Sequence, residues 1–255
     1  VEADSEAAHA LVAPEVAGFR ARELLRATSS VEEAIRRRSF PGAAVAIGRR
    51  DQVVVERGLG TLDWYPGSPA VDPDRTVYDL ASLTKVVATT TAVMLLVEDG
   101  LLELDRPVRE YLPEFAGGAK DDVTIRHLLT HTSGLPAGGS IRAPTPEGSL
   151  SQALQIRLTR PPGIRVVYSD IGFIVLAAAA ERAAGEPLYR LLDRRVFGPL
   201  GMRSTTFLPG EWCNWCAPTD ERRDGTFIQG VVHDPLAQQL GGIAGHAGLF
   251  STVHD

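Results

Sequence analysis

The chain has 255 residues, of which 44% are hydrophobic and 23% charged, and its formal net charge is −6. This length allows one large domain or two intertwined ones, and this composition allows a buried core. The acidic balance and the scattered Lys and Arg residues exclude a broad basic surface for nucleic acid. The longest apolar stretches, 86–97 and 171–180, are shorter than the roughly 20 residues that a bilayer-crossing helix needs, so we predict no membrane span.

The first residue is Val1 rather than Met, so we expect that a preceding signal or vector-derived segment was removed. Two cellular locations stay open for this reason. The chain is cytoplasmic, or it is periplasmic or secreted if the removed segment was a signal.

The N-terminal part of the chain predicts a helix followed by a hairpin. Residues 2–38 are rich in Ala, Glu, Arg and Leu, which favours a helix broken near Pro14. Two β-rich runs follow at 43–48 and 52–58, separated by Arg49-Arg50-Asp51. This pattern predicts a β-hairpin.

The next part of the chain is mainly helical. A helix predicted from Ser82 to Gly100 is apolar nearly all round, which is typical of a helix in the centre of a domain. Shorter helices are predicted at 124–129, 171–184 and 188–196, with a long loop at 137–148. The chain therefore divides into an N-terminal helix and hairpin (1–80), a mainly helical region (81–200) and a loop-rich return segment (201–255). This order indicates a mixed α and β protein.

Both cysteines belong to one motif, Cys213-Asn214-Trp215-Cys216. Such a pair can be a redox centre, half of a zinc site or two structural thiols. The downstream histidines His233 and His246 do not complete the spacing of a common zinc module, and no thioredoxin-like strand and helix surround the pair. We therefore predict a structural or locally disulfide-bonded pair and no metal.

The sharpest local feature is Ser82-Leu83-Thr84-Lys85. Residues three apart at the start of a helix share one face, which brings the lysine amine to the serine hydroxyl. A desolvated lysine can be neutral enough to take the proton of a serine, which makes the hydroxyl a nucleophile. The alternative is an N-cap serine followed by a solvated lysine. A polar pair heading an apolar helix favours the catalytic interpretation.

The second feature is Tyr168-Ser169-Asp170, which lies between the turn at 161–163 and a predicted helix. A tyrosine phenol near a lysine loses its proton more easily and can act as base and acid on a leaving group. The alternative is that Ser169 or Asp170 caps the following helix and that Tyr168 is a packed aromatic residue.

At these residues the chain resembles a known family. Ser82 to Lys85 matches the Ser-x-x-Lys motif of β-lactamases and penicillin-binding proteins. Tyr168-Ser169-Asp170 is similar to the Tyr-x-Asn motif of the class C β-lactamase branch, which includes D-alanyl-D-alanine peptidases and family VIII carboxylesterases. Two further segments resemble signatures of that branch: 124–136, reading TIRHLLTHTSGLP, and 241–252, reading GGIAGHAGLFST. The resemblance covers roughly residues 40–255 in family order.

The resemblance implies an α+β fold, with an antiparallel sheet flanked by helices and an all-α region beside it. It implies that Ser82 is the nucleophile, Lys85 the general base and Tyr168 the acid–base partner of the leaving group. His127 and His131 belong to the signature and would support the helix and turn near the site. No cofactor is implied.

Two departures from the family pattern stand out. Asp170 occupies the position of the motif's Asn, and an ionised carboxylate accepts hydrogen bonds but cannot donate them as an amide does. The family's third motif lies on a late strand that completes the oxyanion hole. His246-Ala247-Gly248 has its letters and makes His246 a candidate substrate-binding residue, but its context resembles an earlier family segment. Otherwise the chain stops before the late strands.

A chain without the late strands would leave the edges of the hairpin at 43–58 exposed. We expect these edges to be covered by a second chain or by a swapped dimer, unless the chain is a truncated natural form. The sequence therefore leaves a dimer or a second chain open as the partner that completes the sheet.

The expected activity is acyl transfer through a serine-bound intermediate, detected as hydrolysis of small or medium carboxylic esters. Ester hydrolysis is the least demanding reaction for a site with Asp170, because alkoxides leave more easily than amines. The alternatives are a cell-wall D-amino-acid peptidase or amidase, a weak β-lactamase, and a penicillin- or muropeptide-binding sensor without turnover. The expected substrates are thus small esters, β-lactams or peptides.

Overall fold

The computed structural model describes residues 11–210 and 213–255. Its contacts divide the chain into two compact units. The first comprises Val1–Tyr78, Trp215–Pro218 and Ser251–Asp255, and the second comprises Asp79–Asn214 and Thr219–Phe250. Helices and strands both occur, so the chain has the mixed α and β architecture that the sequence predicts.

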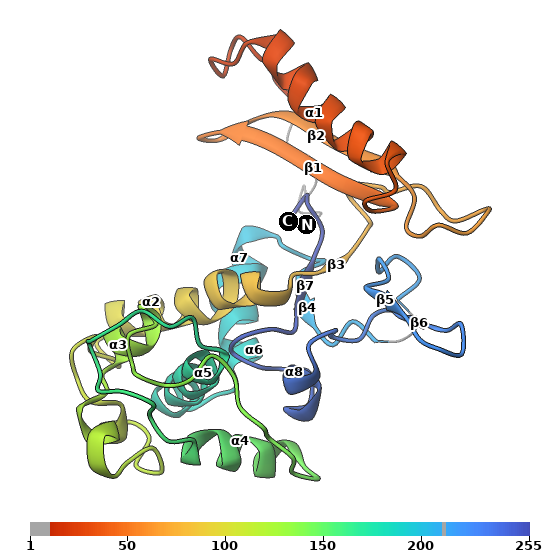
Figure 1. The fold of residues 1–255 in the computed structure, drawn as a ribbon. Coiled ribbons are helices and arrows are strands. Elements are labelled where there is room, and N and C mark those ends of the chain that lie inside the picture. Colours follow the sequence, from red (N-terminus) through yellow and green to blue (C-terminus); the bar gives the residue numbers. More distant parts are fainter. Residues whose placement is uncertain (1–10, 211–212) are drawn as a thin grey trace, which may run out of the picture. The chain divides into compact units, whose positions relative to one another are not determined.

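The first unit contains the predicted hairpin with a helix along it. Strands β1 (Gly42–Arg49) and β2 (Gln52–Gly60) are antiparallel, and α1 (Ala21–Arg36) runs alongside them (Figure 1). The turn between the strands contains Arg50, whose φ of 58° is left-handed. The two strands form a two-stranded sheet, and within residues 11–210 and 213–255 no further strand pairs with them.

The expected helix over 2–38 is shorter than the sequence suggested. Residues 1–10 lie outside the described part of the chain, and α1 begins only at Ala21. Between them the chain turns at Pro14, whose carbonyl accepts the Phe19 N–H at 2.8 Å. Gly18 then adopts a φ of +76°, which a helix cannot continue. Within the described residues the predicted break near Pro14 is present, and the helix begins only after it, at Ala21.

The second unit is built around a helical run that changes its winding. It consists of a single 3₁₀ turn, η1 (Ala81–Leu83), a π-helical segment, η2 (Lys85–Thr90), and α2 (Thr91–Glu98). Gly100 follows with a φ of +71°, which is where the sequence predicts the helix to stop.

This run differs from its prediction in length and burial. Over Ala81–Glu98 its mean hydropathy of 1.4 makes it long and apolar enough to cross a membrane by those criteria alone, because the 3₁₀ turn and the π segment extend it to 18 residues. A core helix passes the same test, and Ala88, Ala92 and Val93 are fully buried in the core of the second unit. The run is not buried all round, since Val86 is 62% exposed.

Further helices surround α5, the most buried helix of the second unit. Ten consecutive residues of α5 (Asp170–Ala184) are buried, from Ile171 to Ala180. It packs against α2, α3, α4 and α6, which surround it in Figure 1. The remaining bounds are α3 (Ile125–Leu129), α4 (Pro146–Gln155), α6 (Leu188–Leu192), α7 (Gly198–Leu200), α8 (Pro235–Gln239), the 3₁₀ segments η3 (Val108–Glu110) and η4 (Gly118–Asp122), and the π segment η5 (Asp193–Phe197).

The predicted loop at 137–148 ends earlier than expected. Helix α4 begins at Pro146, and the Thr145 hydroxyl caps it by accepting the Gly148 N–H at 3.1 Å. Proline in the first helical turn and threonine at the N-cap are both favoured positions. The sequence carried this start signal inside a segment whose composition otherwise indicates a loop.

Short strands complete the fold. One sheet has the order β3-β7-β4, formed by β3 (Tyr78–Asp79), β7 (Leu249–Ser251) and β4 (Thr206–Phe207). The other pairs β5 (Asp220–Glu221) with β6 (Phe227–Ile228). The prediction of a structural or disulfide-bonded cysteine pair is confirmed, because Cys213 and Cys216 are both disulfide-bonded.

Candidate active site

Ser82 and Lys85 lie together at the start of the long helical run of the second unit. The Lys85 ammonium donates to Ser82 Oγ at 3.1 Å, while Ser82 is exposed and Lys85 only 3% exposed. The preceding residue, Ala81, has a φ of +46°, which is unfavourable for a residue with a Cβ. Asp79 holds it there by accepting the Ala81 N–H at 2.8 Å. The backbone therefore carries strain next to an exposed hydroxyl, as functional sites often do.

Lys85 uses its three N–H donors on three different acceptors. Besides Ser82 Oγ, these are Asp170 Oδ1 at 2.7 Å and the main-chain carbonyl of His246 at 3.1 Å. An ammonium has three donors, so this buried group is fully satisfied. Asp170 supplies the opposite charge that a buried cation requires.

Helix α5 positions Tyr168 and Asp170. Ser169 caps this helix: its hydroxyl accepts the Gly172 N–H at 3.0 Å and donates to the Pro136 carbonyl at 2.6 Å. Asp170 is the first residue of the helix, and Tyr168 precedes the cap with its side chain half exposed. The Tyr168 ring centroid is 4.7 Å from Lys85 Nζ. The helix cap that the sequence offered as an alternative is thus present, and it places both flanking side chains at Lys85.

His246 contributes to this cluster through its main chain. Its imidazole is 1% exposed, and Nε2 lies 2.9 Å from Asp234 Oδ1, so the side chain is directed to Asp234. The neighbouring Gly245 carbonyl accepts the Thr89 hydroxyl at 2.7 Å, and the Leu249 N–H donates to Thr84 Oγ1 at 3.1 Å. These bonds fix segment 245–249 along the helical run, with β7 following directly.

Asp234 supports the site through His246, a role that the sequence did not predict for it. It caps α8 by accepting the Ala237 N–H at 2.8 Å, and it pairs with His246. Burial raises the pKa of its carboxyl, but the hydrogen bonds from His246 and from the Ala237 N–H outweigh this effect and lower the pKa to about 2. An Asp-Pro pair before a short helix is a start signal, but nothing local indicates its contact with His246.

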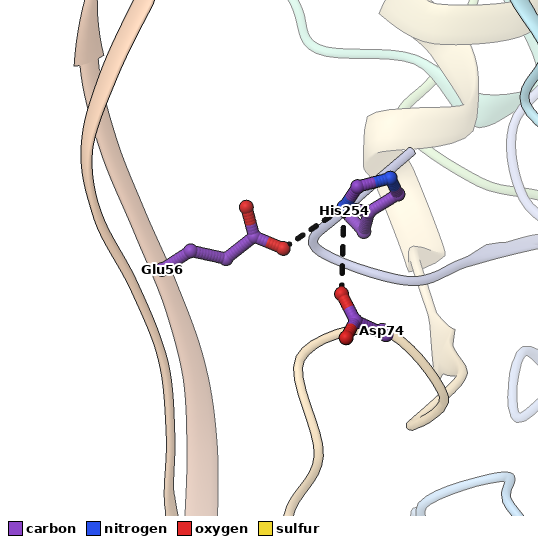
Figure 2. Close-up of side chains that lie close together, drawn as sticks. All are labelled: Glu56, Asp74 and His254. Atoms are coloured by element: carbon purple, nitrogen blue, oxygen red, sulfur yellow. Dashed lines mark hydrogen bonds and ion pairs between the residues drawn. The ribbon is translucent and has the colours of Figure 1, made fainter. Parts of the chain in front are cut away.

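A second cluster of titratable side chains lies in the first unit. His254 Nδ1 is 3.0 Å from Glu56 Oε1 and 3.4 Å from Asp74 Oδ1, and Figure 2 shows the imidazole between the two carboxylates. One ligand atom of each lies within 4.8 Å of the others, so of the described residues these three could hold a metal ion. The hydrogen bond to Glu56 raises the pKa of His254, which burial opposes. A protonated His254 forms ion pairs with both carboxylates, so an ion-pair cluster explains this arrangement without a metal.

The cluster around Ser82 has the arrangement that the sequence led us to expect of a serine hydrolase, and the comparisons with known proteins assign the chain to a family. Residues 22–255 match the family model described as Beta-lactamase. The chain therefore belongs to the beta-lactamase family.

Three similar proteins are named as different hydrolases. The chain is 30% identical to the N-acetylmuramyl-L-alanine amidase of Bacillus subtilis (strain 168), over 96% of this chain and 64% of the relative. It is also 30% identical to the putative D-alanyl-D-alanine carboxypeptidase of Escherichia coli (strain K12), over 95% and 64%. The solved structure of EstCE1, a hydrolase with promiscuous acyltransferase activity, matches 91% of this chain and 70% of its own, with a TM-score of 0.73 and 27% identity. The chain thus spans 64% of the length of these two curated relatives, which is less than two thirds.

Proposed function

We propose that this protein is a serine hydrolase that acts through an acyl-enzyme on small or medium carboxylic esters, with Ser82 as its nucleophile. The observation that carries this proposal is the 3.1 Å hydrogen bond between a buried lysine amine and an exposed serine hydroxyl. A positioned base within hydrogen-bond reach is what a serine needs to become a nucleophile. Membership of the beta-lactamase family supports the same reaction class.

The first chemical step transfers one proton and forms one bond. The reactive form is the one in which the Lys85 ammonium has given up a proton to solvent: Ser82 Oγ then attacks the carbonyl carbon of the ester while its own proton passes to Lys85 Nζ. Asp170, 2.7 Å from Lys85 Nζ, stabilises the ammonium that results. The Asp170 carboxylate thus stabilises the protonated lysine in the way that the aspartate of a Ser-His-Asp triad stabilises the protonated histidine. The main-chain N–H of Ser82, at the start of the helical run, is a donor for the developing oxyanion.

The second step breaks the bond to the leaving group. The tetrahedral intermediate collapses, the carbon–oxygen bond of the ester breaks, and the alkoxide takes a proton through Tyr168. Tyr168 is half exposed and its ring centroid is 4.7 Å from Lys85 Nζ, which suits a group that relays a proton from the amine to a departing alcohol. Water then repeats the sequence on the acyl-enzyme and restores Ser82.

The charge of Asp170 supports an ester as substrate. Its carboxylate is 31% exposed beside Lys85, so it accepts hydrogen bonds only and repels a substrate carboxylate that approaches it. A neutral ester avoids this repulsion, and its alkoxide leaves more easily than an amine. A peptide that ends in D-alanine is the second candidate, because a curated relative is named as a D-alanyl-D-alanine carboxypeptidase.

Parallel incubation with p-nitrophenyl butyrate, a D-alanyl-D-alanine peptide and a fluorescent penicillin separates the candidates. We expect turnover of the ester and loss of that turnover in Ser82→Ala. Faster release of D-alanine than of nitrophenol would favour the peptidase. Labelling by penicillin without turnover of either substrate would favour a sensor. Full ester turnover in Ser82→Ala would contradict the proposal.

A further inference from the structure

The segment 131–137 holds Tyr168-Ser169-Asp170 in place through hydrogen bonds. The Val167 N–H donates to the His131 carbonyl at 2.8 Å, and the Asp170 N–H donates to the Ala137 carbonyl at 2.8 Å. Between these two main-chain bonds, the Ser169 N–H donates to the imidazole Nδ1 of His131 at 3.0 Å. The N–H of the residue that follows Tyr168 is therefore held by a side chain, that of His131.

His131 also packs against the ring that it helps to place. Its ring centroid is 4.6 Å from that of Tyr168 and 5.0 Å from that of Phe173. Its φ of +57° is left-handed, which is uncommon for a residue other than glycine. This backbone strain aims the imidazole back at the 167–170 segment, so the turn and the side chain act on the same three residues.

The bond from Ser169 fixes the protonation of His131. Because Nδ1 accepts a hydrogen bond, it carries no proton, and a neutral ring must carry its proton on Nε2. Burial and the charge of Lys85 lower the pKa of His131, while Asp170 opposes them. Lys85 and Asp170 are the charged groups that shift this pKa, and the rings of Tyr168 and Phe173 and the Ser169 N–H contact the imidazole. These surroundings favour the neutral acceptor form.

We propose that His131 is a positioning residue, which holds Tyr168 and Asp170 in register with Lys85 through its Nδ1 acceptor and its ring. This inference rests on the proposed function of Ser82, Lys85 and Tyr168. The contacts of His131 are with the Tyr168 ring and the Ser169 N–H, so its contribution passes through the 167–170 segment. A displacement of about 1 Å at such a segment is enough to slow a reaction about 100-fold.

Two substitutions separate the two contributions of His131. His131→Phe keeps an aromatic ring against Tyr168 but removes the acceptor for the Ser169 N–H. His131→Asn keeps an acceptor, and asparagine tolerates the left-handed backbone, but the ring is lost. We expect His131→Phe to lower kcat for p-nitrophenyl butyrate about 10- to 100-fold with little change in KM. His131→Asn should retain more of the wild-type kcat than His131→Phe.

His127 provides the matched control. Its Nδ1 also accepts a main-chain N–H, that of Thr124 at 3.2 Å, but this bond caps α3 and does not reach the 167–170 segment. His127→Phe should lower thermal stability and leave kcat near wild type. Equal losses of kcat in the two Phe variants, or no loss in either, would overturn the proposal. The proposed function is tested separately: a fluorophosphonate should label Ser82 in the wild-type protein, and Ser82→Ala must abolish this labelling. A failure of the His131 proposal is thus distinct from a failure of the proposed function.

Nitrogen-15 NMR of the wild-type protein tests the same inference without a substitution. At neutral pH we expect the His131 ring to be the neutral form that is protonated on Nε2. The rate of fluorophosphonate labelling should fall more steeply with acid in the wild type than in His131→Asn, because protonation of Nδ1 removes the bond from Ser169. A ring protonated on Nδ1 at neutral pH, or identical acid limbs in the two proteins, would overturn the proposal.

Discussion

Asp170→Asn tests the charge that accompanies Lys85. The substitution keeps an oxygen acceptor near Lys85 Nζ but removes the negative charge at 2.7 Å from a lysine that is 3% exposed. At an effective dielectric of about 20, the gross attraction at this distance is about 6 kcal/mol. Breaking one side of a buried pair costs about 3–5 kcal/mol. Asp170 is partly exposed and the amide oxygen still accepts, so we expect a net loss of about 2 kcal/mol in the free energy of unfolding.

For a chain of this size, that loss corresponds to a fall in Tm of about 4–8 °C. Without the carboxylate, the ammonium that forms when Lys85 takes the Ser82 proton is less stabilised. Fluorophosphonate labelling of Ser82 should therefore slow by about 10- to 100-fold. Thermal melts and the labelling rate, measured on the same preparation, report the two effects separately.

Asp99→Asn is the matched control for this experiment. Asp99 pairs with Arg195 at 2.6 Å and is 33% exposed, close to the 31% of Asp170, but its partner is itself 29% exposed. Surface ion pairs contribute little to stability, so its Tm should change far less. Equal Tm values for the two variants, together with wild-type labelling of Asp170→Asn, would refute the reasoning.

Three further predictions follow from the same contacts. Lys85→Ala should lower ester turnover by at least about 10²–10⁴-fold, measured with p-nitrophenyl butyrate, and unchanged turnover would contradict its role as base. The pKa of Asp234 is lowered to about 2, so its contribution to stability is present above pH 4 and is lost toward pH 2. In urea unfolding, Asp234→Asn should have a lower free energy of unfolding than the wild type at pH 6, and this difference should become smaller in acid. The pKa of His254 is raised from 6.5, so its contribution is full below that pH and disappears as the pH rises through the folded value; the deficit of His254→Gln in urea should be largest near pH 5, and a constant deficit up to pH 9 would contradict the ion pair.

The parts of the fold that sequence reasoning found are those with local signals. The hairpin follows from two β-rich runs around a short turn, and α5 follows from a capping serine before an apolar run. Ser82 and Lys85 are three residues apart, so helical geometry alone predicts that they meet. The changes of winding along 81–98 carry no comparable signal. The exposed face of this helix was missed because exposed positions on it, such as Leu83, Val86 and Met94, are apolar.

The contacts that complete the site are distant in sequence. Lys85 meets Asp170 across 85 residues and the His246 carbonyl across 161. No pattern within one segment encodes such contacts, and a main-chain acceptor can belong to any residue type. Motif letters made His246 a candidate for its side chain, whereas the structure directs that side chain to Asp234. The role of Asp234 was missed for the same reason.

The central claim is that Ser82 forms the covalent intermediate. Intact-mass and peptide analysis of the chain after reaction with a fluorophosphonate tests it directly, with Ser82→Ala as the control. The account predicts one adduct per chain, located on Ser82, and none in the Ser82→Ala variant. An adduct on another serine, or ester turnover that survives in Ser82→Ala, would contradict it.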